Sequence, residues 1–345
     1  MRLATVEIDT PLGPVPRVVA FQADPRQGTP HLVDVTAAGE LWWERQGCAS
    51  ASEWAGATFP PDLARLLRGG RRGLEMVREA VELALSEGAS GPAPSGAPLS
   101  WSEDQVRRLP LLRAPLLRDF YAFEGHVRAG AQRRQEAVPA PWYTRPAYYK
   151  GNPATLLPPG AEVPWPAYTD ALDYELEFAC VVFAAGPDLR PDEAQDAICG
   201  YSLLCDFSAR DLQREEMQVR LGPAKAKDFA TGLGPWLITS DEVPDPSRLE
   251  ARAYVNGVEA ASGRMGEARW SFAEMVAHAS AAEPLAAGEV MGSGTVEGGS
   301  GQERGRLLQE GDRVDLELLG FGTLSHVVGP RHGGGGRLMA RAAAS

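Results

Sequence analysis

The strand-like segments that follow one another after residue 171 constrain the fold of this chain most. Each is a short apolar run bounded by turn residues: YELEFACVVF, AICGYSLLCDF, GPWLIT, ARAYVNG, EVMGSGTV and RVDLELLGFGTL. Two helical patterns interrupt them, at residues 206–218 and near residues 271–283. Because few strands alternate with full-length helices, a doubly wound sheet is excluded. We predict an α+β, β-rich domain of mixed strands.

The first hundred residues have a different texture. Residues 1–50 alternate short apolar runs with turn residues, which predicts a small β module, and residues 60–87 have the apolar spacing of a helix. The stretch GASGPAPSGAP has the composition of a linker. A chain of 345 residues accommodates two domains. We therefore predict a small N-terminal α+β domain with its linker over residues 1–98, a larger domain over residues 99–330, and a flexible tail over residues 331–345.

Charge, hydropathy and cysteine usage narrow the choice of partners. The net charge of −12 argues against nucleic acid, because phosphate binding needs a basic surface. No stretch of 18 or more apolar residues appears, and the N-terminus MRLATVEIDT has no apolar signal core. We therefore expect no membrane association and a cytoplasmic location. The four cysteines form no C-x-x-C pair and three lie in apolar runs, which predicts buried free thiols at Cys180, Cys199 and Cys205.

Two glutamates in the segment LDYELEF are the first candidate site residues. Glu175 and Glu177 lie two apart in a strand-like run, so both side chains project from one face. Such a pair is commonly the solvated face of a strand. Here the neighbours are apolar, and two adjacent carboxylates in that setting are costly unless a cation or a proton intervenes.

Two further acids stand near residues of complementary chemistry. Asp206 ends an apolar run and is followed by Arg210 and Gln213, which would share its face in a helix; Asp206 would equally serve as an N-cap. Asp119 and His126 are seven residues apart, which in a helix is two turns, or about 10 Å along the axis. A histidine in such a stretch is often only a surface or core residue.

Taken together, these acids offer oxygen ligands and no thiolate. The set is Asp119, Glu175, Glu177 and Asp206. Oxygen-only sites favour hard cations over zinc. We predict one divalent cation, with Mg²⁺ first and Ca²⁺ or Mn²⁺ as alternatives.

The acids belong to a longer series of motifs in which the chain resembles the fumarylacetoacetate hydrolase family. That family carries D-F-Y with a His seven residues after the Asp, an E-x-E strand, and D-x-S-A-R-D-x-Q at the next strand-to-helix turn. The chain has DFYAFEGH from Asp119, ELE from Glu175 and DFSARDLQ from Asp206. Order and spacing match across about residues 105–328. The resemblance implies the mixed β-sheet roll of the family's C-terminal type, preceded by a small N-terminal domain.

The resemblance also implies a role for each matching residue. The implied metal ligands are Asp119, Glu175, Glu177 and Asp206. His126 matches the base that activates water, and Glu303 matches the carboxylate that orients it. Groups that bind the substrate carbonyls and the developing carbanion are matched by Arg210, Gln213 and Lys227, with Lys225 open as the alternative lysine. Substrate-contacting positions are matched by Tyr121, Tyr149 and Thr295.

The activity implied by the resemblance is metal-dependent hydrolysis of a carbon–carbon bond in a fumarylacetoacetate- or acylpyruvate-like 1,3-dicarbonyl acid, in aromatic catabolism. Residues 99–330 would then be the catalytic domain, and a homodimer is implied. Two alternatives stay open. In the first, the same scaffold serves an isomerase, a decarboxylase or a 2-keto acid dehydratase. In the second, the chain is a non-catalytic metal- or ligand-binding protein. His126 paired with Glu303 favours hydrolysis, because a water must be activated.

Overall fold

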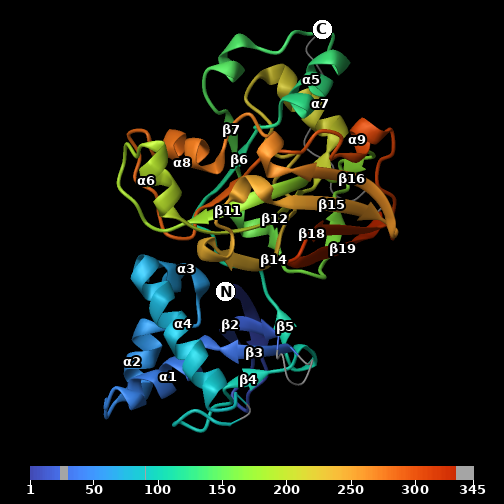
Figure 1. The fold of residues 1–345 in the computed structure, drawn as a ribbon. Helices are drawn as coiled ribbons and strands as arrows, with labels where there is room; N and C mark the ends of the chain where they lie inside the picture. The colour runs from blue at the N-terminus through green and yellow to red at the C-terminus, as the bar shows by residue number, and fades with distance from the viewer. Residues whose placement is uncertain (24–29, 90, 332–345) are drawn as a thin grey trace.

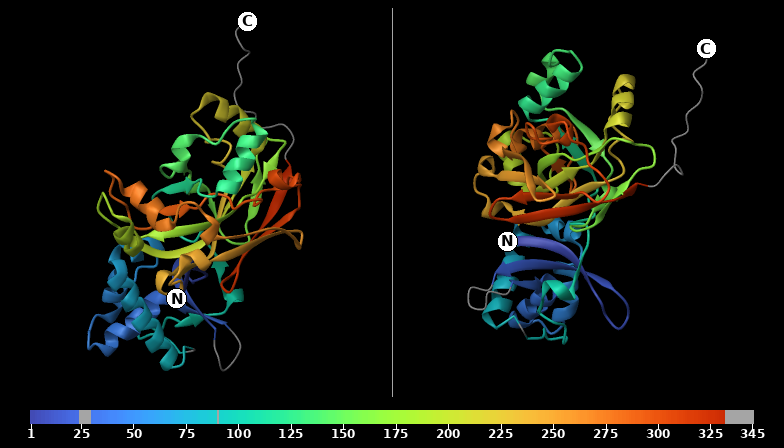
Figure 2. Two further views of the ribbon diagram at one scale, coloured as in Figure 1. Left: turned by 45° about the horizontal axis from the view of Figure 1, so that its top comes forward. Right: turned by 90° about the vertical axis from the view of Figure 1, so that its right-hand side faces the viewer.

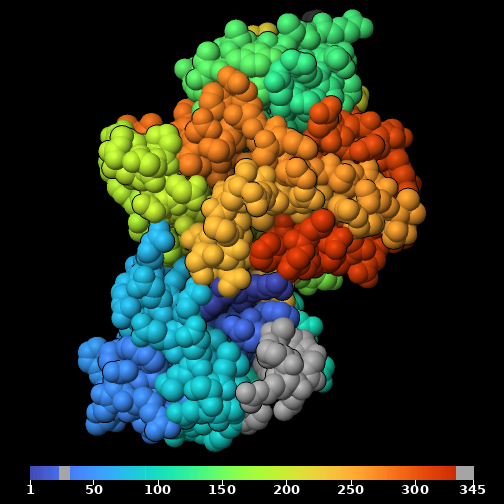
Figure 3. Space-filling model, in the orientation of Figure 1, coloured from blue at the N-terminus to red at the C-terminus, as the bar shows by residue number. Residues whose placement is uncertain are grey.

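The structure is a computed structural model that describes residues 1–23, 30–89 and 91–331. It has an N-terminal lobe, up to residue 108, and a larger C-terminal lobe, from residue 117 onward (Figure 1). Figure 3 shows the blue and cyan surface of the first lobe below the green-to-red surface of the second. The predicted tail lies outside the described residues, apart from Arg331.

The N-terminal lobe packs helices against an antiparallel meander. Its strands are β1 (Arg2–Ile8), β2 (Val15–Ala23), β3 (Pro30–Asp34), β4 (Ser100–Trp101) and β5 (Arg107–Arg108). Its helices are α1 (Val35–Arg45), α2 (Ala51–Thr58), α3 (Leu63–Leu66) and α4 (Gly70–Ser86). The predicted helical spacing is confirmed in α4, where Leu74, Val77 and Val81 are buried. The strands β4 and β5 pair with β3 and β1, and the division at residue 98 stays a prediction.

The predicted β module over residues 1–50 is wrong in its last part, which forms α1. The reason is a capping interaction that follows the last strand of the meander. The side chain of Asp34 accepts hydrogen bonds from the backbone N–H groups of Thr36 and Ala37, both at 3.0 Å, and so begins the helix.

The C-terminal lobe is built on two sheets. Strands of the larger sheet are β6 (Leu117–Phe120), β7 (Tyr148–Gly151), β8 (Leu156–Leu157), β11 (Leu176–Val182), β12 (Ile198–Asp206), β14 (Thr231–Thr239) and β17 (Val290–Gly292). The strand order is β4-β3-β2-β1-β14-β12-β11-β17-β6-β7, so the pairing of β1 with β14 joins the two lobes in one sheet. The second sheet has the order β16-β15-β18-β19-β9, with β9 (Glu162–Trp165), β15 (Glu250–Val255), β16 (Val258–Arg264), β18 (Arg313–Leu318) and β19 (Gly322–Arg331). A short pair joins β10 (Leu172–Asp173) to β13 (Ser208–Ala209).

Few helices accompany these strands. They are α5 (Glu124–Arg133), α6 (Pro191–Ala197), α7 (Arg210–Val219), α8 (Phe272–Ser280) and α9 (Gly301–Arg304). Short 3-10 turns complete the described residues: η1 (Leu67–Gly69), η2 (Glu103–Gln105), η3 (Ala140–Tyr143), η4 (Pro153–Thr155), η5 (Ser240–Glu242), η6 (Pro246–Arg248) and η7 (Met265–Glu267). Helices α5 and α7 stand at the end of the C-terminal lobe that faces away from the N-terminal lobe (Figures 1 and 2). The predicted α+β, β-rich fold class is confirmed.

Two predicted helical placements are wrong. Asp119 lies on β6, between β17 and β7, and the helix that contains His126 begins five residues later. Asp206 is the last residue of β12, whereas α7 begins at Arg210 with Ala209 at its N-cap position. In both segments pairing with distant strands decides the conformation, and those partners are not visible in the local spacing.

The strands at the centre of the larger sheet form the core of the C-terminal lobe. Every residue of β11 and β12 is buried, including the predicted thiols Cys180, Cys199 and Cys205, and all four cysteines of the chain are free. Among the described residues, no helix combines the length and the apolar character that crossing a bilayer requires.

Candidate active site

Three buried carboxylates meet on neighbouring strands of the larger sheet. Asp119 lies on β6, Glu177 on β11 and Asp206 at the end of β12, and one oxygen of each lies within 4.8 Å of the others. The strand β17 separates β6 from β11, and its Gly292 pairs with Asp119. A Cβ atom at Gly292 would stand 2.6 Å from Asp119 Oδ1 and 3.0 Å from Glu177 Oε2. The glycine therefore leaves the space in which the acids converge.

This triad of Asp119, Glu177 and Asp206 requires a counter-charge. Burial raises the pKa of Asp119, and burial with the neighbouring Asp119 charge raises the pKa of Glu177 well above its usual range. Burial likewise raises the pKa of Asp206, although Lys227 opposes it. Within the described residues, Asp119 Oδ1 and Asp206 Oδ1 are buried without a hydrogen-bond partner. Converging, unpartnered carboxylate oxygens fit a hard divalent cation.

Glu175, the fourth predicted ligand, lies beside the triad but is bound by cations of the chain itself. Its Oε1 accepts a hydrogen bond from Arg210 Nη2 at 2.7 Å, and its Oε2 accepts one from Lys227 Nζ. Burial alone would raise the pKa of Glu175, but Arg210 and Lys227 outweigh burial and hold it well below its usual range. Lys227 also donates to Asp206 and so ties Glu175 to the triad.

The structure separates the two candidate lysines. Lys227 is buried at the carboxylates, whereas Lys225 is exposed. The loop that delivers Lys227 is held by Glu216 of α7, whose Oε2 accepts hydrogen bonds from the N–H groups of Ala224 and Ala226 at 2.9 and 3.2 Å. Of the two lysines, Lys227 is thus the one that contacts the buried carboxylates.

Arg210 and Gln213 lie together at the start of α7. Arg210 Nη1 donates to Gln213 Oε1 at 2.9 Å, and its Nε donates to Asp173 Oδ2 at 2.7 Å. Burial would lower the pKa of the guanidinium, but the carboxylates of Glu175 and Asp173 more than offset it and raise that pKa. Arg210 is therefore a fixed positive charge beside the acids.

His126 and Glu303 form a hydrogen-bonded pair although they are 177 residues apart, with 2.9 Å between Nδ1 and Oε2. Burial opposes ionisation of Glu303, but hydrogen bonds from His126 and Ser300 hold its pKa below its usual range. An ionised carboxylate only accepts, so Nδ1 of His126 is the donor in this hydrogen bond. Nε2 lies 3.7 Å from Glu175 Oε1, which is too long for a direct hydrogen bond.

The three predicted substrate-contacting residues all touch this site. The Tyr149 hydroxyl donates to Asp206 Oδ2 at 2.9 Å, and the Thr295 hydroxyl donates to Glu177 Oε1 at 3.3 Å. The Tyr121 ring meets the His126 ring edge-on, with 5.5 Å between centroids. The structure therefore brings together every residue of the predicted site.

Two buried residues of the site were not predicted. Asp173 precedes Glu175 by two positions and accepts from Arg210, and the Ser300 hydroxyl donates to Glu303 Oε2 at 3.0 Å. Signals for both are present in the sequence. Asp173, Glu175 and Glu177 alternate with period two, and Ser300 with Glu303 has the S-x-x-E spacing of a capping box.

The chain is similar in sequence to a known enzyme family. A sequence profile for the fumarylacetoacetate (FAA) hydrolase C-terminal domain matches residues 116–329, a range that contains the whole site. The chain belongs to the fumarylacetoacetate hydrolase family. A curated relative, the oxaloacetate tautomerase YisK of Bacillus subtilis, is 33% identical over 162 residues. That match covers 47% of this chain and 53% of YisK, so the chain spans about half the length of this relative.

Solved structures share the fold of this chain. A maleylpyruvate hydrolase from a Sphingobium species, in complex with manganese(II) and pyruvate, has a TM-score of 0.65 at 22% identity, over 96% of this chain and 100% of its own. A 2-hydroxyhepta-2,4-diene-1,7-dioate isomerase from Mycobacterium marinum has a TM-score of 0.63 at 22% identity, over 95% and 98%. The chain is an enzyme of this family, on a scaffold that serves hydrolases, isomerases and tautomerases.

Proposed function

We propose that this enzyme hydrolyses a carbon–carbon bond in a fumarylacetoacetate- or acylpyruvate-like 1,3-dicarbonyl acid with the help of one divalent cation. The observation that carries the proposal is the His126–Glu303 hydrogen bond of 2.9 Å. Hydrolysis needs a nucleophilic water at a carbonyl, and a base whose tautomer is held by a carboxylate is suited to activate it. Nε2 of His126, the other ring nitrogen, lies 3.7 Å from Glu175 Oε1, beside the triad.

The triad supports the metal part of the proposal. Asp119, Glu177 and Asp206 would hold the cation, with Glu175 as a fourth ligand or as the support between Arg210 and Lys227. When bound, the cation supplies Lewis-acid stabilisation to an enolised 1,3-dicarbonyl group. We take Mg²⁺ as the first candidate and Mn²⁺ and Ca²⁺ as alternatives, because an oxygen-only site accepts each of them.

The residues of the chain divide the reaction between them. His126 Nε2 takes a proton from the water that attacks the carbonyl, and Glu303 stabilises the imidazolium that forms. The bond between the attacked carbon and its methylene neighbour breaks, and the electron pair passes into an enolate. Arg210 and Lys227 are fixed cations beside that developing charge. Return of the proton from His126 to the methylene carbon completes an acid and a 2-oxo acid.

A second candidate is enolisation or isomerisation of a 2-oxo diacid, and the 33% identity to an oxaloacetate tautomerase supports it. This reaction breaks no carbon–carbon bond. Arg210 and Lys227 would stabilise the same kind of enolate, while His126 would move a proton between carbon and oxygen without activating water. The two candidates therefore share the carboxylates and cations and differ in the need for Glu303.

One experiment separates the candidates. Acetylpyruvate, fumarylacetoacetate and oxaloacetate are incubated with the enzyme, with and without Mg²⁺ or Mn²⁺, while enol absorbance is followed and products are identified. Metal-dependent release of two acids from acetylpyruvate is the expected result. A change in enol absorbance without cleavage points to the tautomerase, release of carbon dioxide or water to a decarboxylase or dehydratase, and no turnover to a binding protein. The cytoplasmic homodimer that we also propose is checked by light scattering and cell fractionation.

A further inference from the structure

Asp173 is a fully buried carboxylate that none of these steps uses. It lies at the end of β10, and its Oδ1 accepts a hydrogen bond from the N–H of Tyr174 at 2.9 Å. Its Oδ2 accepts two more, from Arg210 Nε at 2.7 Å and from the backbone N–H of Gln302 at 3.0 Å. One oxygen atom thus joins the first residue of α7 to the first turn of α9.

The two donors belong to different parts of the site. Arg210 contacts Glu175 and has the substrate-carbonyl role that the family resemblance implies, whereas Gln302 immediately precedes Glu303. The helix α9 has four residues, so its placement depends on contacts with its surroundings. A Cβ atom at Gly301 would stand 2.5 Å from Asp173 Oδ1, which shows how closely the helix approaches this carboxylate.

We propose that Asp173 is a positioning residue. It fixes the position of the Arg210 guanidinium relative to the His126–Glu303 pair. The importance of this relative placement for catalysis rests on the proposed function. Removing Asp173 would free α9 to shift, and Glu303 would move away from His126. The same change would let the guanidinium of Arg210 rotate toward Glu175.

The way in which Asp173 contacts Arg210 supports this role. Asp173 uses Nε, whereas Nη2 donates to Glu175 and Nη1 to Gln213. Each Nη has two N–H groups, so one on each nitrogen stays available for a substrate oxygen. A carboxylate that gripped both Nη atoms in a fork would have taken those donors. Asp173 therefore fixes the plane of the guanidinium without using the edge that meets substrate.

The test compares Asp173→Ala and Asp173→Asn with a matched control, Asp34→Ala. Asp34 is also buried, accepts two backbone hydrogen bonds at 3.0 Å and pairs with Arg17 Nε at 3.1 Å, but it lies in the N-terminal lobe. Two readouts are measured: kcat and KM for acetylpyruvate with Mn²⁺, and the Nδ1 proton resonance of His126. The resonance is assigned by its absence in His126→Gln.

Asp173→Ala is expected to lower kcat, raise KM and reduce kcat/KM by about 10- to 100-fold, because all three hydrogen bonds that the carboxylate accepts are lost, those from Arg210 and Gln302 included. It should also shift or broaden the His126 resonance, although neither His126 nor Glu303 is changed. Asp173→Asn retains an oxygen acceptor in the same shape but loses the charge, so its effects should be in the same direction and smaller. Asp34→Ala should leave both readouts unchanged.

The proposal is overturned if the Asp173 variants keep wild-type kinetic constants and an unmoved His126 resonance. It is also overturned if Asp34→Ala produces the same changes, since the role would then be merely structural. If Asp173→Ala fails to fold, the isosteric Asp173→Asn decides. If the wild-type enzyme does not cleave acetylpyruvate, the proposed function fails, whereas the His126 resonance still tests the positioning by Asp173.

Discussion

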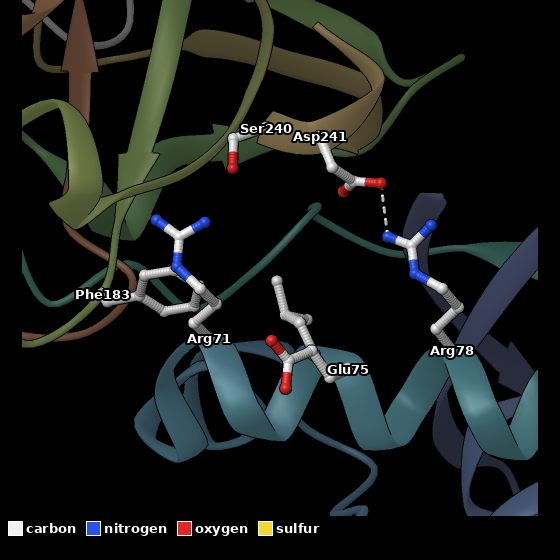
Figure 4. Close-up of a pocket in the computed structure, with 7 residues that line it drawn as sticks. Arg71, Glu75, Arg78, Phe183, Ser240 and Asp241 are labelled. Carbon is white, nitrogen blue, oxygen red and sulfur yellow. Dashed lines mark hydrogen bonds and ion pairs between the residues drawn. The ribbon is translucent and has the colours of Figure 1, made fainter. Parts of the chain in front are cut away.

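The acidic site and the crevice between the lobes both hold ion pairs, but in opposite environments. The crevice has a volume of 220 Å³ and lies between α4 and the C-terminal lobe, where Arg78 pairs with Asp241 (Figure 4). Those two side chains are 37% and 48% exposed. In the site, the side chains of Lys227, Glu175 and Asp206 are at most 5% exposed.

The difference shows which cluster is built for a ligand. The ion pairs that line the crevice are solvated, so they contribute little either to stability or to binding. In the site, buried carboxylates outnumber buried cations. The buried cations are Arg210 and Lys227, and the buried carboxylates are those of Asp119, Asp173, Glu175, Glu177 and Asp206. Excess charge of one sign in a desolvated place is expensive unless a counter-ion binds. A divalent cation would supply that counter-charge, as we propose.

Asp206→Ala is expected to have the largest effect. It removes one oxygen ligand and the partner of Lys227, so we expect loss of Mn²⁺ binding and a fall in kcat/KM of at least about 10³-fold, with the fold retained. Calorimetric titration with Mn²⁺, turnover and circular dichroism measure the three outcomes. Asp241→Ala in the crevice is the control and should change neither metal binding nor turnover. Wild-type turnover in Asp206→Ala would end the metal proposal.

Glu303→Gln separates two parts of the site, the His126–Glu303 pair and the triad of carboxylates. The amide keeps the shape but cannot hold the imidazolium, so kcat for hydrolysis should fall by about 10²–10⁴-fold. Binding of Mn²⁺ should stay within about twofold, because Glu303 is outside the triad. Rapid-quench turnover and calorimetry measure the two quantities, with Glu75→Gln from the crevice as the control. Unchanged hydrolysis would exclude the pair as the activator of water.

Lys227→Met tests the cost of unbalanced charge. With metal removed by a chelator, Glu175 and Asp206 lose a buried cation, and the free energy of unfolding should fall by about 3–5 kcal/mol. Added Mn²⁺ should restore part of the loss. The control is Lys225→Met, because this exposed lysine two residues away should change stability by less than about 0.5 kcal/mol. Equal urea midpoints for the two variants would contradict the assigned role of Lys227.

Sequence reasoning predicted candidate site residues where local pattern and chemistry coincide. Glu175 and Glu177 are two residues apart among apolar neighbours, a spacing that predicts two side chains on one face of a strand. In the structure Glu177 lies on β11 and Glu175 immediately precedes that strand. The resemblance added residues from distant segments, and the structure brings His126 within 2.9 Å of Glu303. The mixed, β-rich fold followed from the scarcity of helical patterns among the strand-like runs.

Other features depend on contacts that no local pattern reveals. Asp119 and His126 have helical spacing, yet Asp119 lies in a strand because its segment pairs with β17, which is far along the chain. The choice between Lys225 and Lys227 depends on how Glu216 holds the preceding loop. Asp173 is the first acid of an alternating series in the sequence. Its structural role depends on the hydrogen bonds that it accepts from Arg210 and Gln302, and no local pattern shows these.

Arg78→Ala should have the smallest effect and so completes the comparison. The pair with Asp241 is solvated, and its loss should lower the free energy of unfolding by about 0.2–1 kcal/mol, and by less in high salt. Turnover should be unchanged, because the crevice is lined by residues other than those of the site. Urea denaturation of Arg78→Ala, Asp241→Ala and the double variant measures the coupling directly. A fall in kcat would mean that contacts between the lobes are coupled to the site, and the two clusters would no longer be independent.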